Sequence, residues 1–148
     1  MKVQLENVKP MDIEKRSFEI ITEELGDKKL VPGTELVVKR CIHTSADFDY
    51  ADNLCFSPEV IEKAMAAIKD GACIVTDTQM AKSGINKRAL ARYGGEVYCF
   101  MSDKDVAEMA KKNGTTRATA SMDKAAALNK KLIFAIGNAP TALCVFMN

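Results

Sequence analysis

The sequence predicts an α/β fold, with a parallel sheet covered by helices in three layers and a helical N-terminal portion. Helical patterns and short apolar runs alternate from residue 57 onward, which is typical of parallel sheets with right-handed crossovers. The runs at residues 72–76 and 132–136 are continuously apolar, as expected for strands that are buried on both faces. With 148 residues and no internal repeat or linker, residues 1–148 are expected to form a single domain.

Two helices are expected before the sheet. The first spans residues 12–25, where apolar side chains recur at helical spacing, and Gly26 ends it. The second is opened by Thr34 as its N-cap and runs through His43. Residues 47–56 show no regular pattern and are expected to be irregular.

The later elements follow from helix-start signals, apolar runs and turn residues. Ser57 as N-cap and Pro58 as the first helical residue predict the start of a helix. After it we expect, in order, a strand at 72–76, one or two short helices within 80–93, a strand at 96–101, helices at 103–112 and 116–129, a strand at 132–136 and a last helix after residue 140.

Charge and hydropathy exclude several classes of partner. The 21 Lys and Arg residues balance 20 Asp and Glu residues, so the net charge is +1 and a nucleic-acid partner is not expected. No apolar run approaches the roughly 18 residues that a membrane span needs, so no membrane association is expected. The first residues lack the apolar core of a signal peptide, which predicts a cytoplasmic location.

The five cysteines form an odd set without a C-x-x-C pair. This spacing is unlike a disulfide framework or a zinc site, and four of the five have apolar neighbours, so buried reduced thiols are expected. They are Cys41, Cys55, Cys73, Cys99 and Cys144. His43 is the single histidine, which excludes a histidine-based metal cluster.

Three clusters of small polar residues are expected at one edge of the sheet. Those at 76–78 and 137–141 follow strands, and the one at 113–117 lies between the helix after the second strand and the next helix. The carboxyl ends of parallel strands meet at one edge of a sheet, where ligands bind. The hydroxyls, amides and helix N-terminal N–H groups of the clusters suit an anionic ligand. Ordinary helix capping is the favoured interpretation of any one cluster taken alone, whereas the three clusters together at one edge favour a site.

Arg40 and His43 are three residues apart on an expected helix and therefore share a face. They could form an acid or anion-binding pair, or simply the solvent-exposed end of a helix. Nucleotide-binding and hydrolase signatures, G-x-G-x-x-G, G-x-x-x-x-G-K-[ST] and G-x-S-x-G, are missing from the sequence. Cys41 lies two residues before His43, so a helix directs the two to different faces, which disfavours a Cys–His nucleophile.

Several segments, in order along nearly the whole chain, together resemble the precorrin-8X methylmutase family of corrin biosynthesis. They are I-E-K-R-S-F at 13–18, V-K-R-C-I-H-T-S-A-D at 38–47, F-S-P at 56–58, G-A-C-I-V-T-D-T-Q-M at 71–80, G-T-T-R at 114–117 and A-I-G-N-A-P-T-A-L at 135–143. Family members continue past the last segment with P-V-G-F and G-R-x-G-G-S stretches. The chain ends at Asn148, so we expect it to lack the family's C-terminal part.

The resemblance implies an isomerase of cobalamin biosynthesis that moves a methyl group from C-11 to C-12 of a corrinoid tetrapyrrole. The substrate is precorrin-8X or cobalt-precorrin-8, the product is hydrogenobyrinate or cobyrinate, and neither a redox cofactor nor a catalytic metal is needed. The family also implies a homodimer. The alternative is a non-catalytic tetrapyrrole-binding domain.

The catalytic histidine of the family corresponds to His43, which is expected to place a proton or hydrogen bond at the reacting ring. Ser17 and Arg40 match positions of the family at the substrate. Motif and strand-end arguments add further expected substrate contacts: Arg16, Arg117, Thr76, Thr78 and Asn138. Arginine suits the ring's acetate and propionate groups because it can hold a carboxylate through two hydrogen bonds.

Overall fold

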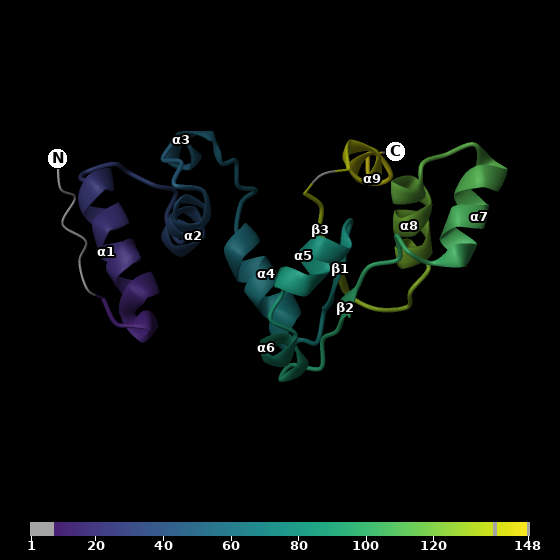
Figure 1. Ribbon diagram of the computed structural model, residues 1–148, viewed down its shortest axis with the longest axis horizontal. Coiled ribbons are helices and arrows are strands. Elements are labelled where there is room, and N and C mark those ends of the chain that lie inside the picture. The colour runs from purple at the N-terminus through teal and green to yellow at the C-terminus, as the bar shows by residue number, and fades with distance from the viewer. Residues whose placement is uncertain (1–7, 138, 148) are drawn as a thin grey trace. The chain divides into compact units, whose positions relative to one another are not determined.

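The computed structural model of the chain describes residues 8–137 and 139–147. The chain forms two compact units, Met1–Ile61 and Glu62–Asn148 (Figure 1). None of the helices in the described residues is long and apolar enough to cross a membrane.

The first unit is helical. It contains a 3-10 turn η1 (Pro10–Asp12) and the helices α1 (Ile13–Leu25), α2 (Glu35–Ser45) and α3 (Tyr50–Asn53). Both long helices lie where the sequence predicts them, with Gly26 following α1 and Thr34 preceding α2. The short helix α3 corrects the expectation that residues 47–56 are irregular throughout.

The core of this unit is built from three buried residues of α1 and α2. Ile21, Val38 and Ile42 are at most 5% exposed. Partly buried side chains from α1, the loop after it and the segment around α3 pack against them: Leu25, Leu30, Phe48, Ala51, Leu54 and Phe56. Residues 47–56 are therefore anchored by apolar contacts, which a pattern based on helical or strand spacing does not reveal.

Helix α4 (Val60–Lys69) starts later than the helix-start signal predicts. Glu59 has a φ of +57°, a left-handed conformation that helical residues do not adopt, and the N–H of Val60 donates to the carbonyl of Ser57. Ser57 and Pro58 therefore belong to a turn before α4, and the expectation that they are its N-cap and first residue is wrong.

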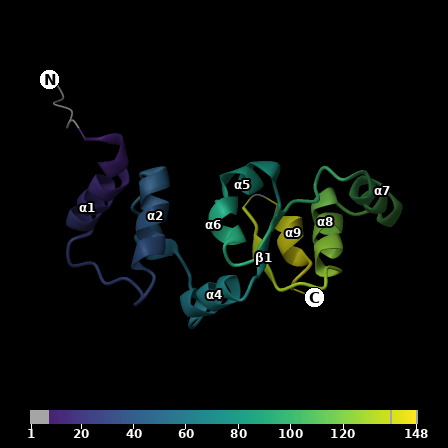
Figure 2. The same ribbon diagram turned by 90° about the horizontal axis from the view of Figure 1, so that it is seen from below.

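The second unit contains the sheet and the remaining helices. They are β1 (Cys73–Thr76), α5 (Gln79–Gly84), α6 (Lys87–Ala91), β2 (Val97–Tyr98), α7 (Lys104–Asn113), α8 (Arg117–Ala126), β3 (Leu132–Ala135) and α9 (Pro140–Cys144). The strands are parallel in the order β2-β1-β3, with Ile74 opposite Val97 and Ile133. In Figures 1 and 2, β1 lies between α5 and α6 on one side and α8 and α9 on the other. The predicted α/β class with a parallel sheet is confirmed.

The strand β2 is shorter than the expected strand at 96–101. It pairs with β1 only through Val97 and Tyr98, and the chain then leaves the sheet toward α7. At the start of β2 the backbone of Gly95 approaches that of Ala72 so closely that a Cβ would overlap the Ala72 carbonyl oxygen. Glycine is therefore required here for close approach.

The main core of the second unit lies between β1 and the helices α8 and α9. Val75, Met122, Ala125 and Ala142 are fully buried there. All five cysteines are free thiols, as predicted, but only Cys73 and Cys99 are buried. Cys41 is partly buried and Cys55 and Cys144 are exposed, which corrects the expectation of five buried thiols.

Candidate functional site

The only histidine lies against α1. Its Nδ1 is 2.7 Å from the Oγ of Ser17, in a partly buried position. One turn earlier on both helices, the Nη1 and Nη2 atoms of Arg40 donate to the two carboxylate oxygens of Glu14 at 2.8 and 2.9 Å. Each pair is separated by 26 residues in the sequence, so one turn of α1 faces one turn of α2 through both contacts.

Buried neighbours fix these polar contacts. Ile42 directly precedes His43 and is 1% exposed, while Ile21 lies one turn after Ser17 and is 5% exposed. Because the apolar faces of α1 and α2 pack on each other, the residues beside those faces are brought into hydrogen-bonding distance at the edge of the core. Local helical pattern therefore places Ser17 and His43, and the packing of the two helices joins them.

The ring of Phe18 contacts the side chains of both His43 and Arg40. Its centroid is 5.8 Å from that of the His43 ring in an edge-on arrangement, and the guanidinium carbon of Arg40 is 5.1 Å from it. Contacts of this kind between a cation and an aromatic face are favourable. Phe18 therefore supports the Arg40 side chain independently of Glu14.

An open cleft of about 350 Å³ lies beside His43. Its walls are mainly apolar, and α1 and α2 both contribute polar groups. The lining residues are Val8, Ile13, Arg16, Ser17, Ile20, Ile21, Glu24, Ile42, His43, Ala46 and Phe48. Of the predicted site residues it brings together Arg16, Ser17 and His43. Arg40 is not among the described residues that line it and is connected to His43 through Phe18.

The Glu14–Arg40 pair brings two opposite charges, and hence no net charge, to the turn beside His43. Hydrogen bonds from the Arg40 guanidinium lower the pKa of the Glu14 carboxyl, and the positive charges of Arg40 and His43 act in the same direction. The same hydrogen bonds raise the pKa of Arg40. The two side chains are 53% and 57% exposed, so water and salt screen the pair.

In the second unit, the polar clusters at the strand ends do meet. The buried carboxylate of Asp77, after β1, accepts hydrogen bonds from the backbone N–H groups of Gly137 and Ala139, after β3, at 3.1 and 3.0 Å. The hydroxyls of Thr116 and Thr141 are 2.8 Å apart, which joins the start of α8 to that of α9. The prediction that the polar clusters at 76–78, 113–117 and 137–141 lie close together is therefore confirmed.

The predicted ligand groups in these clusters make local contacts. The fully buried Thr76 hydroxyl donates to the carbonyl oxygens of Thr78 and Tyr98, and the Thr78 hydroxyl caps α5 by accepting from the N–H of Ala81. Arg117 is exposed at the first position of α8. Asn138 lies outside the described residues. Substrate binding by Thr76, Thr78, Arg117 and Asn138 stays a prediction.

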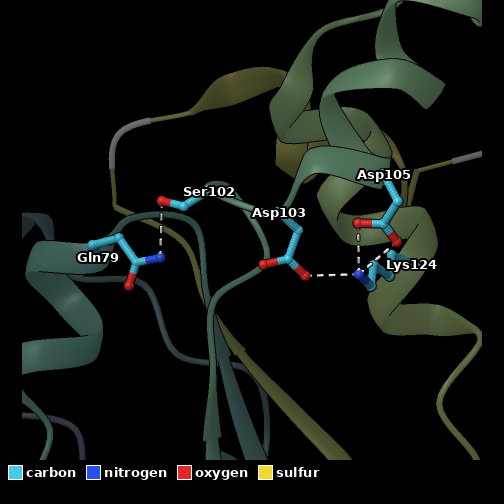
Figure 3. Close-up of polar contacts among 5 residues, drawn as sticks. All are labelled: Gln79, Ser102, Asp103, Asp105 and Lys124. Atoms are coloured by element: carbon cyan, nitrogen blue, oxygen red, sulfur yellow. Dashed lines mark hydrogen bonds and ion pairs between the residues drawn. The ribbon is translucent and has the colours of Figure 1, made fainter.

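A further network follows β1 and β2 (Figure 3). The side-chain amide of Gln79 donates to the Ser102 hydroxyl at 3.2 Å. The ammonium group of Lys124, on α8, donates to the carboxylates of Asp103 and Asp105, each at 2.7 Å, and joins the two helices of the α7–α8 hairpin. These hydrogen bonds raise the pKa of Lys124 and lower that of Asp105. The network has a structural role because it fixes the start of α7.

Glu14, Phe18 and Asp77 are among the site residues that were not singled out from the sequence. Glu14 and Phe18 lie within I-E-K-R-S-F at 13–18, and Asp77 lies within the segment at 71–80. The segments that carry the family resemblance therefore contained the signal. What the sequence did not provide was the pairing of Glu14 with Arg40, which depends on how α1 and α2 pack.

Comparison with known proteins identifies the family. The chain matches the family described as precorrin-8X methylmutase over residues 12–148. It is 46% identical over 136 residues to the cobalt-precorrin-8 methylmutase of Priestia megaterium, covering 92% of this chain and 60% of that protein. It is 44% identical over 140 residues to the Salmonella typhimurium protein of the same name, covering 90% and 67%.

Solved structures agree with the sequence comparison. The precorrin-8x methylmutase of Thermus thermophilus superposes with a TM-score of 0.80 at 36% identity, covering 92% of this chain and 66% of that one. The chain belongs to the precorrin-8X methylmutase family. It spans 60% and 61% of the length of the first two curated relatives.

Proposed function

We propose that the chain acts in the methylmutase reaction, in which a methyl group of a corrinoid ring moves from C-11 to C-12. The enzyme class is that of an isomerase, an intramolecular transferase of cobalamin biosynthesis. The observation that carries the proposal is the position of His43, which lines an apolar cleft while Ser17 holds its Nδ1 atom. The names of the related methylmutases support the same reaction.

The role proposed for His43 is that of a proton donor. When Ser17 accepts from Nδ1–H, the proton that can be delivered to the ring is the one on Nε2. The bond from the methyl carbon to C-11 breaks as the bond to C-12 forms. Because the reaction is an isomerisation, a proton delivered to the ring is matched by one lost from it, and no oxidant or reductant is consumed.

The cleft suits only part of such a substrate. Its volume of about 350 Å³ lies at the lower end of the roughly 300–1,000 Å³ typical of small-molecule sites. We propose that apolar side chains such as Ile20 and Phe48 contact the edge of the ring. Arg16, in the cleft wall, and Arg40, beside it, are proposed to bind peripheral carboxylates, because guanidinium groups hold carboxylates in a fixed orientation.

We propose the cobalt-containing ring, cobalt-precorrin-8, as the substrate, with cobyrinate as the product. The relatives at 44–46% identity are named for this substrate, whereas the precorrin-8X methylmutase of Sinorhizobium sp is 32% identical. A non-catalytic tetrapyrrole-binding domain is not favoured, since these relatives are named as enzymes.

Replacing His43 by alanine tests the catalytic role. We expect the rate of methyl migration to fall by about 10²–10⁴-fold, the usual contribution of a general acid, with corrinoid affinity largely kept. Absorption spectra would follow single turnovers of cobalt-precorrin-8 and precorrin-8X separately.

Thr44→Ala is the matched control, because the exposed Thr44 hydroxyl donates to the backbone carbonyls of Arg40 and Cys41 within α2. Normal turnover by the His43 variant would refute the acid role, and corrinoid binding without turnover by the unaltered chain would favour the binding-domain alternative.

We further propose a homodimer in the cytoplasm without nucleic-acid or membrane partners. The family resemblance supports the dimer, which analytical ultracentrifugation would test. The near-neutral net charge of +1 supports the lack of a nucleic-acid partner. The five free thiols support a reducing compartment such as the cytoplasm. Titration of the protein's thiols in cell extracts would test whether all five are reduced.

A further inference from the structure

We propose that Glu14 is a specificity residue of the corrinoid site. It occupies the guanidinium of Arg40 as a stand-in for a substrate carboxylate and is displaced when that carboxylate binds. The inference rests on the proposed function, because it requires a ligand that carries carboxylates. The family resemblance does not assign a role to Glu14, which enters only through its contact with Arg40.

The geometry supports a direct exchange. The Oε2 and Oε1 atoms of Glu14 accept from Nη1 and Nη2 of Arg40 at 2.8 and 2.9 Å, which is the two-pronged arrangement that a ligand carboxylate adopts. One pair of N–H groups cannot serve two carboxylates in this way. A ligand that binds the same end of Arg40 must therefore replace Glu14.

The structure also makes the exchange easy. Both side chains are more than half exposed, so their attraction is screened by water. The buried Ile21, Val38 and Ile42 hold α1 against α2, and Phe18 supports the guanidinium, so neither the helix contact nor the position of Arg40 needs Glu14. These observations favour a competitor for Arg40 over a residue that positions it.

Charge gives the exchange a consequence for His43. Arg40 lies one helical turn from His43, so the partner of Arg40 decides whether an uncompensated positive charge lies beside the imidazole. Glu14 supplies the compensating charge in the free protein, and a substrate carboxylate would supply it in the complex. A ligand without a carboxylate at this place would have to leave Glu14 bound and would gain nothing from Arg40.

The test measures the affinity of cobyrinate for the unaltered chain and its variants by isothermal titration calorimetry. Glu14→Gln removes the competing charge with little change of shape, and we expect the Kd to fall by about two- to fivefold, the scale of an exposed ion pair. Glu23→Gln removes the same charge from the exposed face of α1 and controls for general repulsion of a polyanion. Its Kd should stay within experimental error.

A double variant identifies the partner. In an Arg40→Gln background, Glu14→Gln should no longer change the Kd, because the competition is for that guanidinium. Equal or weaker binding by the single Glu14 variant would overturn the inference while leaving the proposed function intact, and so would an equal gain in the Glu23 control. Failure of the unaltered chain to bind cobyrinate would refute the proposed function and this inference together.

Discussion

Removing the Ser17 hydroxyl should slow methyl migration without weakening substrate binding. Ser17→Ala deletes the atom that lies 2.7 Å from His43 Nδ1 in a partly buried position. A hydrogen bond of this kind contributes about 0.5–1.5 kcal/mol. If that interaction orients the proton donor in the transition state, the rate falls by about two- to tenfold, since each 1.36 kcal/mol corresponds to a factor of ten.

The assay must separate orientation of His43 from direct contact with the substrate. Single-turnover rates at saturating cobalt-precorrin-8 report the chemical step, and calorimetric titration with cobyrinate reports binding. Ser17→Thr restores a hydroxyl at the same position and should recover most of the rate. ¹⁵N NMR of the imidazole should show an increased population of the other tautomer in the alanine variant only.

Two results would refute this reasoning. An unchanged rate for Ser17→Ala would mean that the hydrogen bond to Nδ1 has no role in catalysis. A higher Kd with an unchanged rate at saturating substrate would mean that Ser17 binds the substrate, as the family resemblance implies, and does not orient His43.

The remaining predictions concern the second unit. Gly95→Ala should lower the free energy of unfolding by about 1–3 kcal/mol in urea titrations, because the added Cβ would meet the Ala72 carbonyl oxygen. The control is Gly84→Ala, which has open space around it and should be neutral or stabilising by up to about 1 kcal/mol. A neutral Gly95 variant would contradict the close approach. The lowered pKa of Asp105 beside Lys124 stabilises the fold above the carboxyl's ordinary pKa of 3.8, and this contribution is lost as the pH falls through the lowered value. The urea midpoint of unfolding should therefore fall less steeply between about pH 5 and 2 in Lys124→Met than in the unaltered chain. An equally steep fall in both proteins would refute the stabilising role of the Asp105–Lys124 pair.

Much of the fold was predictable because its signals are local. The helical spacing before Gly26, the opening at Thr34 and the continuous apolar run at 73–76 each act within a few residues, and the corresponding elements lie where expected. The same holds for the alternation that predicts a parallel sheet. Local signals failed at Glu59, whose left-handed backbone delays α4 although Ser57 and Pro58 form a standard helix start.

The site was predictable only in part. Helical spacing placed Arg40 and His43 on one face, and the family resemblance added Ser17. Which residues of α1 meet that face depends on how the two helices pack around Ile21 and Ile42, and no short sequence window contains this information. The pairing of Glu14 with Arg40 therefore had to come from the structure.

The two contacts between α1 and α2 have the same spacing along both helices. Glu14 and Ser17 are three residues apart on α1, as Arg40 and His43 are on α2, so one packing arrangement of two helices sets both contacts together. The partly buried contact orients the imidazole, and the exposed contact holds an ion pair that a ligand can exchange. In the proposed mechanism, the proton donor and the replaceable carboxylate would therefore lie side by side, and a substrate carboxylate could replace Glu14 at Arg40 without disturbing the contact between Ser17 and His43.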